Sequence, residues 1–155
     1  MSTRSSEEQK AAIRRYMDEL YNKGNTAVVD EEVAPNFVYR TAAALVTPDR
    51  EGLIQEALLV RKAFPDLHCT VDDVLVEGDM LVMRWTMRGT QEGDYFGVPP
   101  SHKQVTYSGL SLVRNVEDKS VEAWTFFNTL GLFQELGAFP QAVVGQQPEA
   151  PQVQA

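Results

Sequence analysis

The amino-acid sequence predicts an α+β fold in which the helices come early in the chain and the long strands come late. Two observations carry this prediction. Apolar residues recur with a helical period up to Pro65, and four segments rich in β-branched and aromatic residues follow it. The length of 155 residues fits about one domain. The expected order of elements is α-α-β-α-β-β-β-β-α.

A first helix is expected from a pair of serines to a glycine. Ser5 and Ser6 each precede a glutamate or glutamine by three residues, which is the spacing of a capping box. Between Ile13 and Tyr21, apolar residues recur at i, i+3, i+4, i+7 and i+8 and so form one helix face. Gly24 is typical of a helix end.

A short helix and a short strand are expected next. Asn25 is a favourable cap for a helix that runs to about Val33, and Pro35 should stop this helix. The composition of 36–41 then predicts a strand, because apolar and aromatic side chains dominate its centre.

A third helix is expected to begin at a threonine-proline pair. Thr47 followed by Pro48 has the pattern of an N-cap with proline at the first helical position. Apolar side chains from Leu53 to Phe64 recur at helical spacing, and Pro65 ends the helix.

Four long strands with short connections should form an antiparallel meander. Their breaks are turn-like: Gly78 lies in the first, Pro99 and Pro100 lie in a longer second loop, and Asn115 opens the third. The expected strands are 67–77, 80–91, 103–114 and 119–127.

A last short helix is expected at about 129–136, where Gly137 ends it. The residues after it are rich in proline, glutamine and alanine and show no apolar period, as disordered segments do. We therefore expect one domain at 1–139 and a disordered tail at 140–155.

The expected sheet needs a cover for one apolar face, and the N-terminal helices can provide it. A twisted sheet that curls around these helices gives a cone, with a pocket between sheet and helices. Such a pocket is the expected ligand site.

Charge and cysteine content exclude several classes of protein. With 22 acidic and 14 basic residues, the formal net charge is −8, which argues against nucleic acid and anionic membranes as partners. No apolar run reaches the ~18 residues of a membrane span. The single cysteine, Cys69, cannot form an intrachain disulfide, which fits a cytoplasmic location.

The motifs of several enzyme classes are also absent from the sequence. It has no nucleophile elbow, Walker loop, dinucleotide fingerprint or Cys-x-x-Cys pair. His68 and His102 are not at metal-ligand spacing with each other or with Cys69, so no metal site is expected. Hydride transfer and phosphoryl transfer therefore have no support in the sequence.

A series of short motifs runs in order through most of the chain. They are AFPDL at 63–67, EGD at 77–79, RWT at 84–86, GT at 89–90, Gly93, GVPP at 97–100, Val105, Glu122, Trp124, GL at 131–132 and LG at 136–137. In their order and spacing, over about residues 10–137, these motifs resemble the SnoaL-like polyketide cyclase family.

This resemblance implies a fold, an assembly and an activity. The implied fold is the α+β cone shared with nuclear transport factor two and ketosteroid isomerase, and the implied assembly is a homodimer or a larger homo-oligomer. Members of known activity close a polyketide ring by intramolecular aldol condensation without a cofactor. Related members have taken on other chemistry, including hydroxylation, so the fold alone does not fix the function.

The sequence departs from the family pattern at three places. Asn128 stands where the family has an aspartate, Gln91 stands where the family often has histidine, and Ser101-His102 replaces Thr-Gly in the loop after the two prolines. Because an amide does not titrate, Asn128 cannot be a base. It can orient a carbonyl in the pocket, or it can cap the last helix, and the two roles are compatible.

The remaining candidates divide into a pocket wall and alternative acid-base groups. Glu122, Asp94 and His102 are the alternative acids or bases. Glu122 can instead form an ion pair with an arginine on a neighbouring strand, and the other two can be solvated loop residues. The side chains expected to line the pocket are Trp85, Met87, Gln91, Leu112, Arg114 and Trp124.

The sequence thus predicts a pocket protein for a small, apolar ligand that bears a carbonyl group. The leading hypothesis is a cofactor-independent enzyme of the polyketide (ester) cyclase type, with Asn128 at the position of the family's base. The alternative is a non-catalytic module of the same fold that binds a small ligand or forms a dimer.

Overall fold

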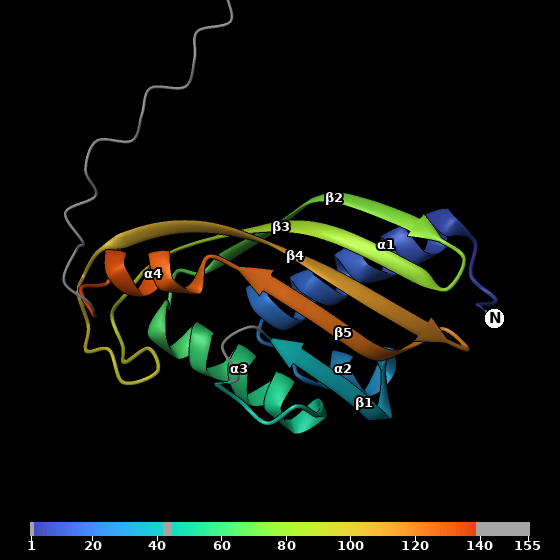
Figure 1. Ribbon diagram of the computed structural model, residues 1–155, viewed down its shortest axis with the longest axis horizontal. Helices are drawn as coiled ribbons and strands as arrows, with labels where there is room; N and C mark the ends of the chain where they lie inside the picture. The colour runs from blue at the N-terminus through green and yellow to red at the C-terminus, as the bar shows by residue number, and fades with distance from the viewer. Residues whose placement is uncertain (1, 42–44, 139–155) are drawn as a thin grey trace, which may run out of the picture.

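The computed structural model describes residues 2–41 and 45–138 and confirms the predicted α+β fold class (Figure 1). The tail expected to be disordered, 140–155, lies outside the described residues. The elements in chain order are α1 (Ser6–Met17), the π-helix η1 (Asp18–Asn22), α2 (Ala27–Glu32), β1 (Val33–Thr41), α3 (Arg50–Ala63), β2 (His68–Glu77), β3 (Met80–Thr90), β4 (Gln104–Val116), β5 (Lys119–Phe127) and α4 (Thr129–Glu135).

The five strands form one curved sheet in the order β1-β5-β4-β3-β2. Strands β2 to β5 are the predicted antiparallel meander, whereas β1 pairs with β5 in parallel. Figure 1 shows α1 running across one face of the sheet and α3 lying beside β1. Among the described residues, β1 and β2 remain the edges of a sheet that does not close into a barrel.

The first helix begins as predicted, with a capping box at Ser5. The Ser5 hydroxyl accepts from the Glu8 backbone N–H at 3.2 Å, and the Glu8 carboxylate accepts from the Ser5 backbone N–H at 2.6 Å. The end of this helix differs, because it continues as the π-helix η1. At the end of η1, the Asn22 side chain bonds both the N–H and the C=O of Cys69 and so fastens the helix to strand β2.

The starts of β1 and α3 differ from their predicted positions by about three and two residues. Strand β1 begins at Val33 and contains Pro35, which is tolerated because β1 is an edge strand with an irregular register before Val38. The N-cap of α3 is Asp49, whose carboxylate accepts from the Gly52 N–H at 2.9 Å. The expected cap, Thr47, instead donates to Asp49.

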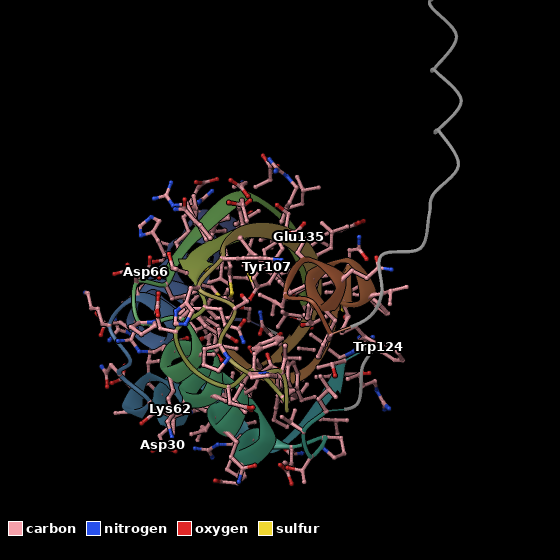
Figure 2. All side chains as sticks on the ribbon, turned by 90° about the vertical axis from the view of Figure 1, so that its left-hand side faces the viewer. Asp30, Lys62, Asp66, Tyr107, Trp124 and Glu135 are labelled. Carbon is pink, nitrogen blue, oxygen red and sulfur yellow. The ribbon has the colours of Figure 1, made fainter. Side chains whose placement is uncertain are left out.

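The sheet has an inner face against the helices and an outer face away from them. Inward-facing side chains of β3 to β5 are buried and alternate with exposed ones along each strand. Figure 2 views the molecule end-on, with Tyr107 inside the ring of elements and Trp124 at its outside. This alternation decides which side chains can reach a ligand.

Candidate functional site

A cavity lies between the inner face of the sheet and the helices α1, η1 and α3. The space between its wall atoms, with the open mouth included, is about 920 Å³. Leu45 is the one lining side chain that is exposed and so marks the opening. Nine lining side chains are aromatic: Tyr16, Tyr21, Phe37, Tyr39, Trp85, Tyr95, Phe96, Tyr107 and Phe127.

Among the described residues, Glu56 is the only one with a carboxyl group in the wall of this cavity, and no lysine, arginine or histidine lines it. It lies on α3, three residues after Leu53 and four before Val60, both of which are buried. This spacing places a carboxyl group on the apolar face of the helix. Glu56 itself is partly exposed and lines the cavity.

Burial raises the pKa of Glu56 from 4.5 to about 7. One hydrogen bond works in the opposite direction, since the Tyr39 hydroxyl donates to Glu56 Oε1 at 2.9 Å and favours the ionised form. The carboxyl group therefore changes its charge near neutral pH. A pKa near the working pH is the property that general acid-base catalysis requires.

Five tyrosines interact electrostatically with Glu56, and they come from different parts of the fold. In each of them burial raises the pKa of the hydroxyl, and the negative charge of Glu56 raises it further. All five hydroxyls therefore keep their protons near neutral pH and can donate hydrogen bonds. They are Tyr16 of α1, Tyr21 of η1, Tyr39 of β1, Tyr95 of the loop before β4, and Tyr107 of β4.

Tyr107 has a weak hydrogen-bond partner. Its hydroxyl donates to Sδ of Met87 at 3.4 Å, and a thioether is a poor acceptor. A ligand oxygen with negative charge would be a much better acceptor for the same hydroxyl. Tyr107 is thus available to bind a substrate carbonyl.

Buried polar side chains on the inner face of the sheet bond one another across three strands. The indole Nε1–H of Trp85 donates to Ser111 Oγ at 3.1 Å, and Ser111 Oγ lies 2.9 Å from Thr125 Oγ1. Strands β3, β4 and β5 each contribute one of these side chains.

The structure places Trp85 and Met87 in the cavity wall, where the sequence analysis expected them. Three other expected wall residues, Leu112, Arg114 and Trp124, lie on the outer face, so that expectation is corrected. In the sheet Leu112 pairs with Trp124 and Arg114 pairs with Glu122, and these positions lie on the face that points away from the helices. Trp124 is 40% exposed and packs under the Arg40 guanidinium.

Gln91 is buried, yet it shapes a loop rather than the cavity. Its side-chain amide donates to the backbone oxygens of Gly93 and Val98, and its Oε1 accepts from the Ser101 N–H at 3.0 Å. These three bonds hold the turns of the loop between β3 and β4. Gln91 does not belong to the cavity lining, contrary to expectation.

Glu122 lies on the outer face of β5 and has charged neighbours. Its Oε1 accepts from Arg40 at 3.1 Å and from the Trp124 indole at 2.7 Å, and Arg114 lies 3.9 Å from Oε2. Hydrogen bonds, from Arg40 first, lower the pKa of Glu122. Glu122 therefore forms the ion pair that the sequence analysis gave as its alternative role. It does not line the cavity, so it is not placed to act as a base on a ligand there.

The two loop candidates also lie outside the cavity wall. The Asp94 carboxylate accepts from the Gly97 N–H at 2.9 Å and so stabilises a turn. His102 is exposed, and its Nδ1 lies 2.7 Å from the Glu92 carboxylate. Both positions match the solvated-loop alternative.

Asn128 is the N-cap of α4. Its Oδ1 accepts from the Gly131 N–H at 2.9 Å, its side chain is exposed, and it is not among the residues that line the cavity. After Phe126 it continues the outward-facing positions of β5. The expectation that Asn128 faces the pocket is therefore corrected, and capping is its observed role.

The sequence analysis missed Glu56 and the tyrosines that surround it. A signal for Glu56 was present, because a carboxyl group at helical spacing between Leu53 and Val60 interrupts an otherwise apolar face. Such a group needs a partner or a raised pKa. No local pattern identifies Tyr39 as that partner, since the contact joins β1 to α3.

The profile of the SnoaL-like polyketide cyclase family matches residues 11–136. The chain belongs to this family. No curated protein matches the chain. The chain also matches solved structures, and the match extends over nearly the whole length of each of them.

Three of these structures illustrate the similarity. A proposed SnoaL-like polyketide cyclase from Jannaschia sp. CCS1 is 26% identical, with a TM-score of 0.78 over 88% of this chain and 98% of that chain. AclR, a proposed hydroxylase from Streptomyces galilaeus, is 25% identical, with a TM-score of 0.76 over 88% and 100%. IdmH, a proposed polyketide cyclase from Streptomyces antibioticus, is 28% identical, with a TM-score of 0.71 over 83% and 98%.

Residues 2–41 and 45–138 contain neither a cluster of metal ligands nor a helix that could span a membrane. No group of three or more histidine, cysteine, aspartate or glutamate side chains in these ranges is arranged to hold a metal ion. No helix in them has the length and apolar character needed to cross a membrane.

Proposed function

We propose that this member of the family is a cofactor-independent enzyme of the cyclase type, which acts on a small, mostly apolar substrate with carbonyl groups. The observation that carries the proposal is Glu56, a single carboxyl group with a pKa of about 7 in an aromatic cavity. In this proposal Glu56 is the base, and the base is not at Asn128.

The proposed reaction is an aldol ring closure without oxidation or reduction. The Glu56 carboxylate takes a proton from a carbon between two carbonyls, and the C–H electron pair passes to the carbonyl as an enolate. The enolate carbon forms a bond to a second carbonyl carbon of the same substrate. The resulting alkoxide then takes the proton back from Glu56, which returns to its ionised form.

Tyr107 is the proposed donor to the enolate oxygen. Its hydroxyl is held only by the weak acceptor Met87 Sδ, so it can turn to the substrate at little cost. A preorganised donor in a cavity that excludes water stabilises developing charge more than the same donor does in bulk solvent. The aromatic side chains of the wall supply the apolar contacts.

Glu56→Gln tests the proposal, because glutamine keeps the shape of the side chain and removes the base. The assay is deuterium exchange into a small β-keto ester, followed by NMR. A positioned base contributes roughly 10²–10⁴-fold, so the variant should lose about that factor. Glu122→Gln is the matched control and should exchange like the wild type. Equal exchange in Glu56→Gln and the wild type would contradict the proposal.

The outer face of the sheet supports a second proposal, that the protein forms a homodimer. The outer face carries an apolar row across four strands, because Leu75, Val82, Leu112 and Trp124 are successive partners in the register. Leu110 and Phe126 extend it and are about half exposed. We propose that a second copy covers this row, since arginines and carboxylates flank it and can pair across a twofold axis.

We also propose a cytoplasmic location. It is supported by Cys69, a buried and unpaired thiol that suits a reducing compartment.

A further inference from the structure

The indole ring of Trp85 is fixed against strand β4 in the wall of the cavity. Its neighbour in the register is Gly109, where a Cβ atom would overlap Cζ2 of the ring, so a glycine is needed for this close approach. The ring also packs edge-on against Tyr107 and Phe127, with centroid distances of 6.0 and 5.9 Å. These contacts aim its Nε1–H at Ser111 Oγ, which accepts at 3.1 Å.

Three hydrogen-bond donors on this part of the wall share two hydrogen bonds. They are the Trp85 indole and the hydroxyls of Ser111 and Thr125, whose oxygens are 2.9 Å apart. Because the indole can only donate, Ser111 accepts from it, and its own hydrogen is then available for Thr125. The opposite direction would leave an unused hydrogen on Ser111, the more deeply buried of the two hydroxyls. The unused hydrogen therefore belongs to Thr125.

Thr125 is thus the last member of this network, and its hydroxyl hydrogen has no acceptor among the described residues. Its side chain lines the cavity. In the sheet Thr125 pairs with Thr41, and Tyr39 lies two residues before Thr41 on the same face of β1. Since the Tyr39 hydroxyl donates to Glu56, Thr125 lies on the side of the cavity that carries the proposed base.

A second donor with little to bind lies further along the same face of β4. Tyr107 is four residues before Ser111, and the Trp85 ring lies over Gly109 between them. The Tyr107 hydroxyl has only the thioether of Met87 as an acceptor. The inner face of the sheet therefore offers two separate hydroxyl donors to a ligand with two acceptor oxygens.

We propose that Thr125 is a second substrate-binding donor, and that Tyr107 and Thr125 each bind one carbonyl oxygen of a β-dicarbonyl substrate. The inference rests on the proposed function and assigns a contact to the second carbonyl of its substrate. Loss of the proton between the two carbonyls leaves an enolate whose negative charge is shared by both oxygens. A donor held in place at each oxygen stabilises this charge. Trp85 and Ser111 act through Thr125 and are positioning residues.

The test compares two probes that have the same apolar frame and differ in one oxygen. The first is dimedone, a cyclic β-diketone that is an enolate anion at neutral pH. The second is the monoketone in which a methylene replaces one of its carbonyls. Calorimetry measures both dissociation constants in full-length Glu56→Gln, which has no carboxylate to repel the anion. The quantity compared between variants is the preference for dimedone, which is the ratio of these two constants.

Thr125→Val in this background should lower the preference for dimedone about tenfold, because it removes a hydrogen bond to a charged oxygen. The monoketone keeps Tyr107 as its donor and should bind nearly as before. Ser111→Ala should lower the preference by a smaller factor, since Thr125 keeps its hydrogen but loses the partner that orients it. General damage to the cavity would weaken both probes and leave their ratio unchanged.

Thr106→Val is the matched control, because Thr106 is exposed on the outer face of β4 and does not line the cavity. It should leave the preference unchanged. The proposal is overturned if Thr125→Val and Thr106→Val give the same preference, because the Thr125 hydroxyl would then only satisfy Ser111 in the core.

A second pair of variants keeps the test decisive if Thr125→Val does not fold. Thr125→Ser retains the hydroxyl and should prefer dimedone as strongly as the parent protein does, whereas Thr125→Ala should show the lowered preference. Equal preferences in these two variants would overturn the proposal. No proton is transferred in this measurement, so its failure is distinct from a failure of the proposed base, which the exchange assay of Glu56→Gln reports.

Discussion

One glutamate lies near each face of the sheet, and the pKa values of the two carboxyl groups shift in opposite directions. Glu56 reaches the cavity at the inner face, where burial raises its pKa to about 7. Glu122 lies on the outer face, where Arg40, Trp124 and Arg114 lower its pKa. The same side chain thus has a raised pKa on one face and a lowered pKa on the other.

This difference follows from what surrounds each carboxylate. Desolvation disfavours the charged form, whereas nearby cationic groups and donors favour it. The cavity offers Glu56 one hydrogen bond from Tyr39, while the outer face offers Glu122 two arginines. The surroundings of a glutamate on each face therefore set the direction in which its pKa shifts.

The free energy of unfolding should depend on pH in opposite ways for Glu56 and Glu122. The pKa of Glu56 is higher in the folded protein than in the unfolded chain, so its contribution is full below about pH 4.5 and is lost as the pH rises through about 7. This loss amounts to roughly 3 kcal/mol. Urea unfolding across this range should show a shallower decline in Glu56→Gln than in the wild type.

For Glu122 the free energy of unfolding should change with pH in the opposite direction. Its pKa is lowered in the folded protein, so its contribution is present above about pH 4.5 and is lost as the pH falls through the lowered value. Glu122→Gln should keep the decline between pH 4.5 and 7. If the free energy of unfolding fell equally steeply with pH in Glu56→Gln and the wild type over that range, the raised pKa of Glu56 would be contradicted.

The assembly proposal tests the outer face alone. Trp124→Glu places a charge in the apolar row, so light scattering at micromolar concentration should fall from two chain masses to one. Glu51→Gln on the exposed side of α3 is the control and should leave the mass unchanged. A wild-type protein that already scatters as one chain would show that the row is not a dimer interface.

The smallest expected effect belongs to Asn128. Asn128→Ala removes the cap of α4 and should cost about 1 kcal/mol of unfolding free energy, with deuterium exchange unchanged. Chemical denaturation and the exchange assay measure the two quantities on one sample. A large loss of deuterium exchange without a loss of unfolding free energy would show that Asn128 takes part in the reaction.

The sequence predicted the elements well because local signals define them. The capping box at Ser5 and the turn at Gly78 lie where expected, and the meander follows from short connections. The parallel pairing of β1 with β5 was not predictable in this way. It joins residues some 80 positions apart, such as Tyr39 and Ala123, through no local pattern.

The candidate site was harder to predict than the fold. Strand β4 carries Leu110 and Leu112 on one face and Val113 on the other, so apolar character alone did not reveal which face is buried. The wall assignments of Leu112 and Trp124 failed for this reason. Glu56 was missed because the apolar side chains define the helical period of α3, and a single polar residue between them does not belong to that pattern.

The most direct test of this account is a carboxyl titration of the wild-type protein, which compares Glu56 and Glu122 in one NMR experiment. The signals are assigned by Glu56→Gln and Glu122→Gln. The account predicts a pKa of about 7 for Glu56 and a pKa below 4.5 for Glu122. A Glu56 signal that titrates at or below 4.5 would contradict it, because the cavity would then hold an ordinary carboxylate.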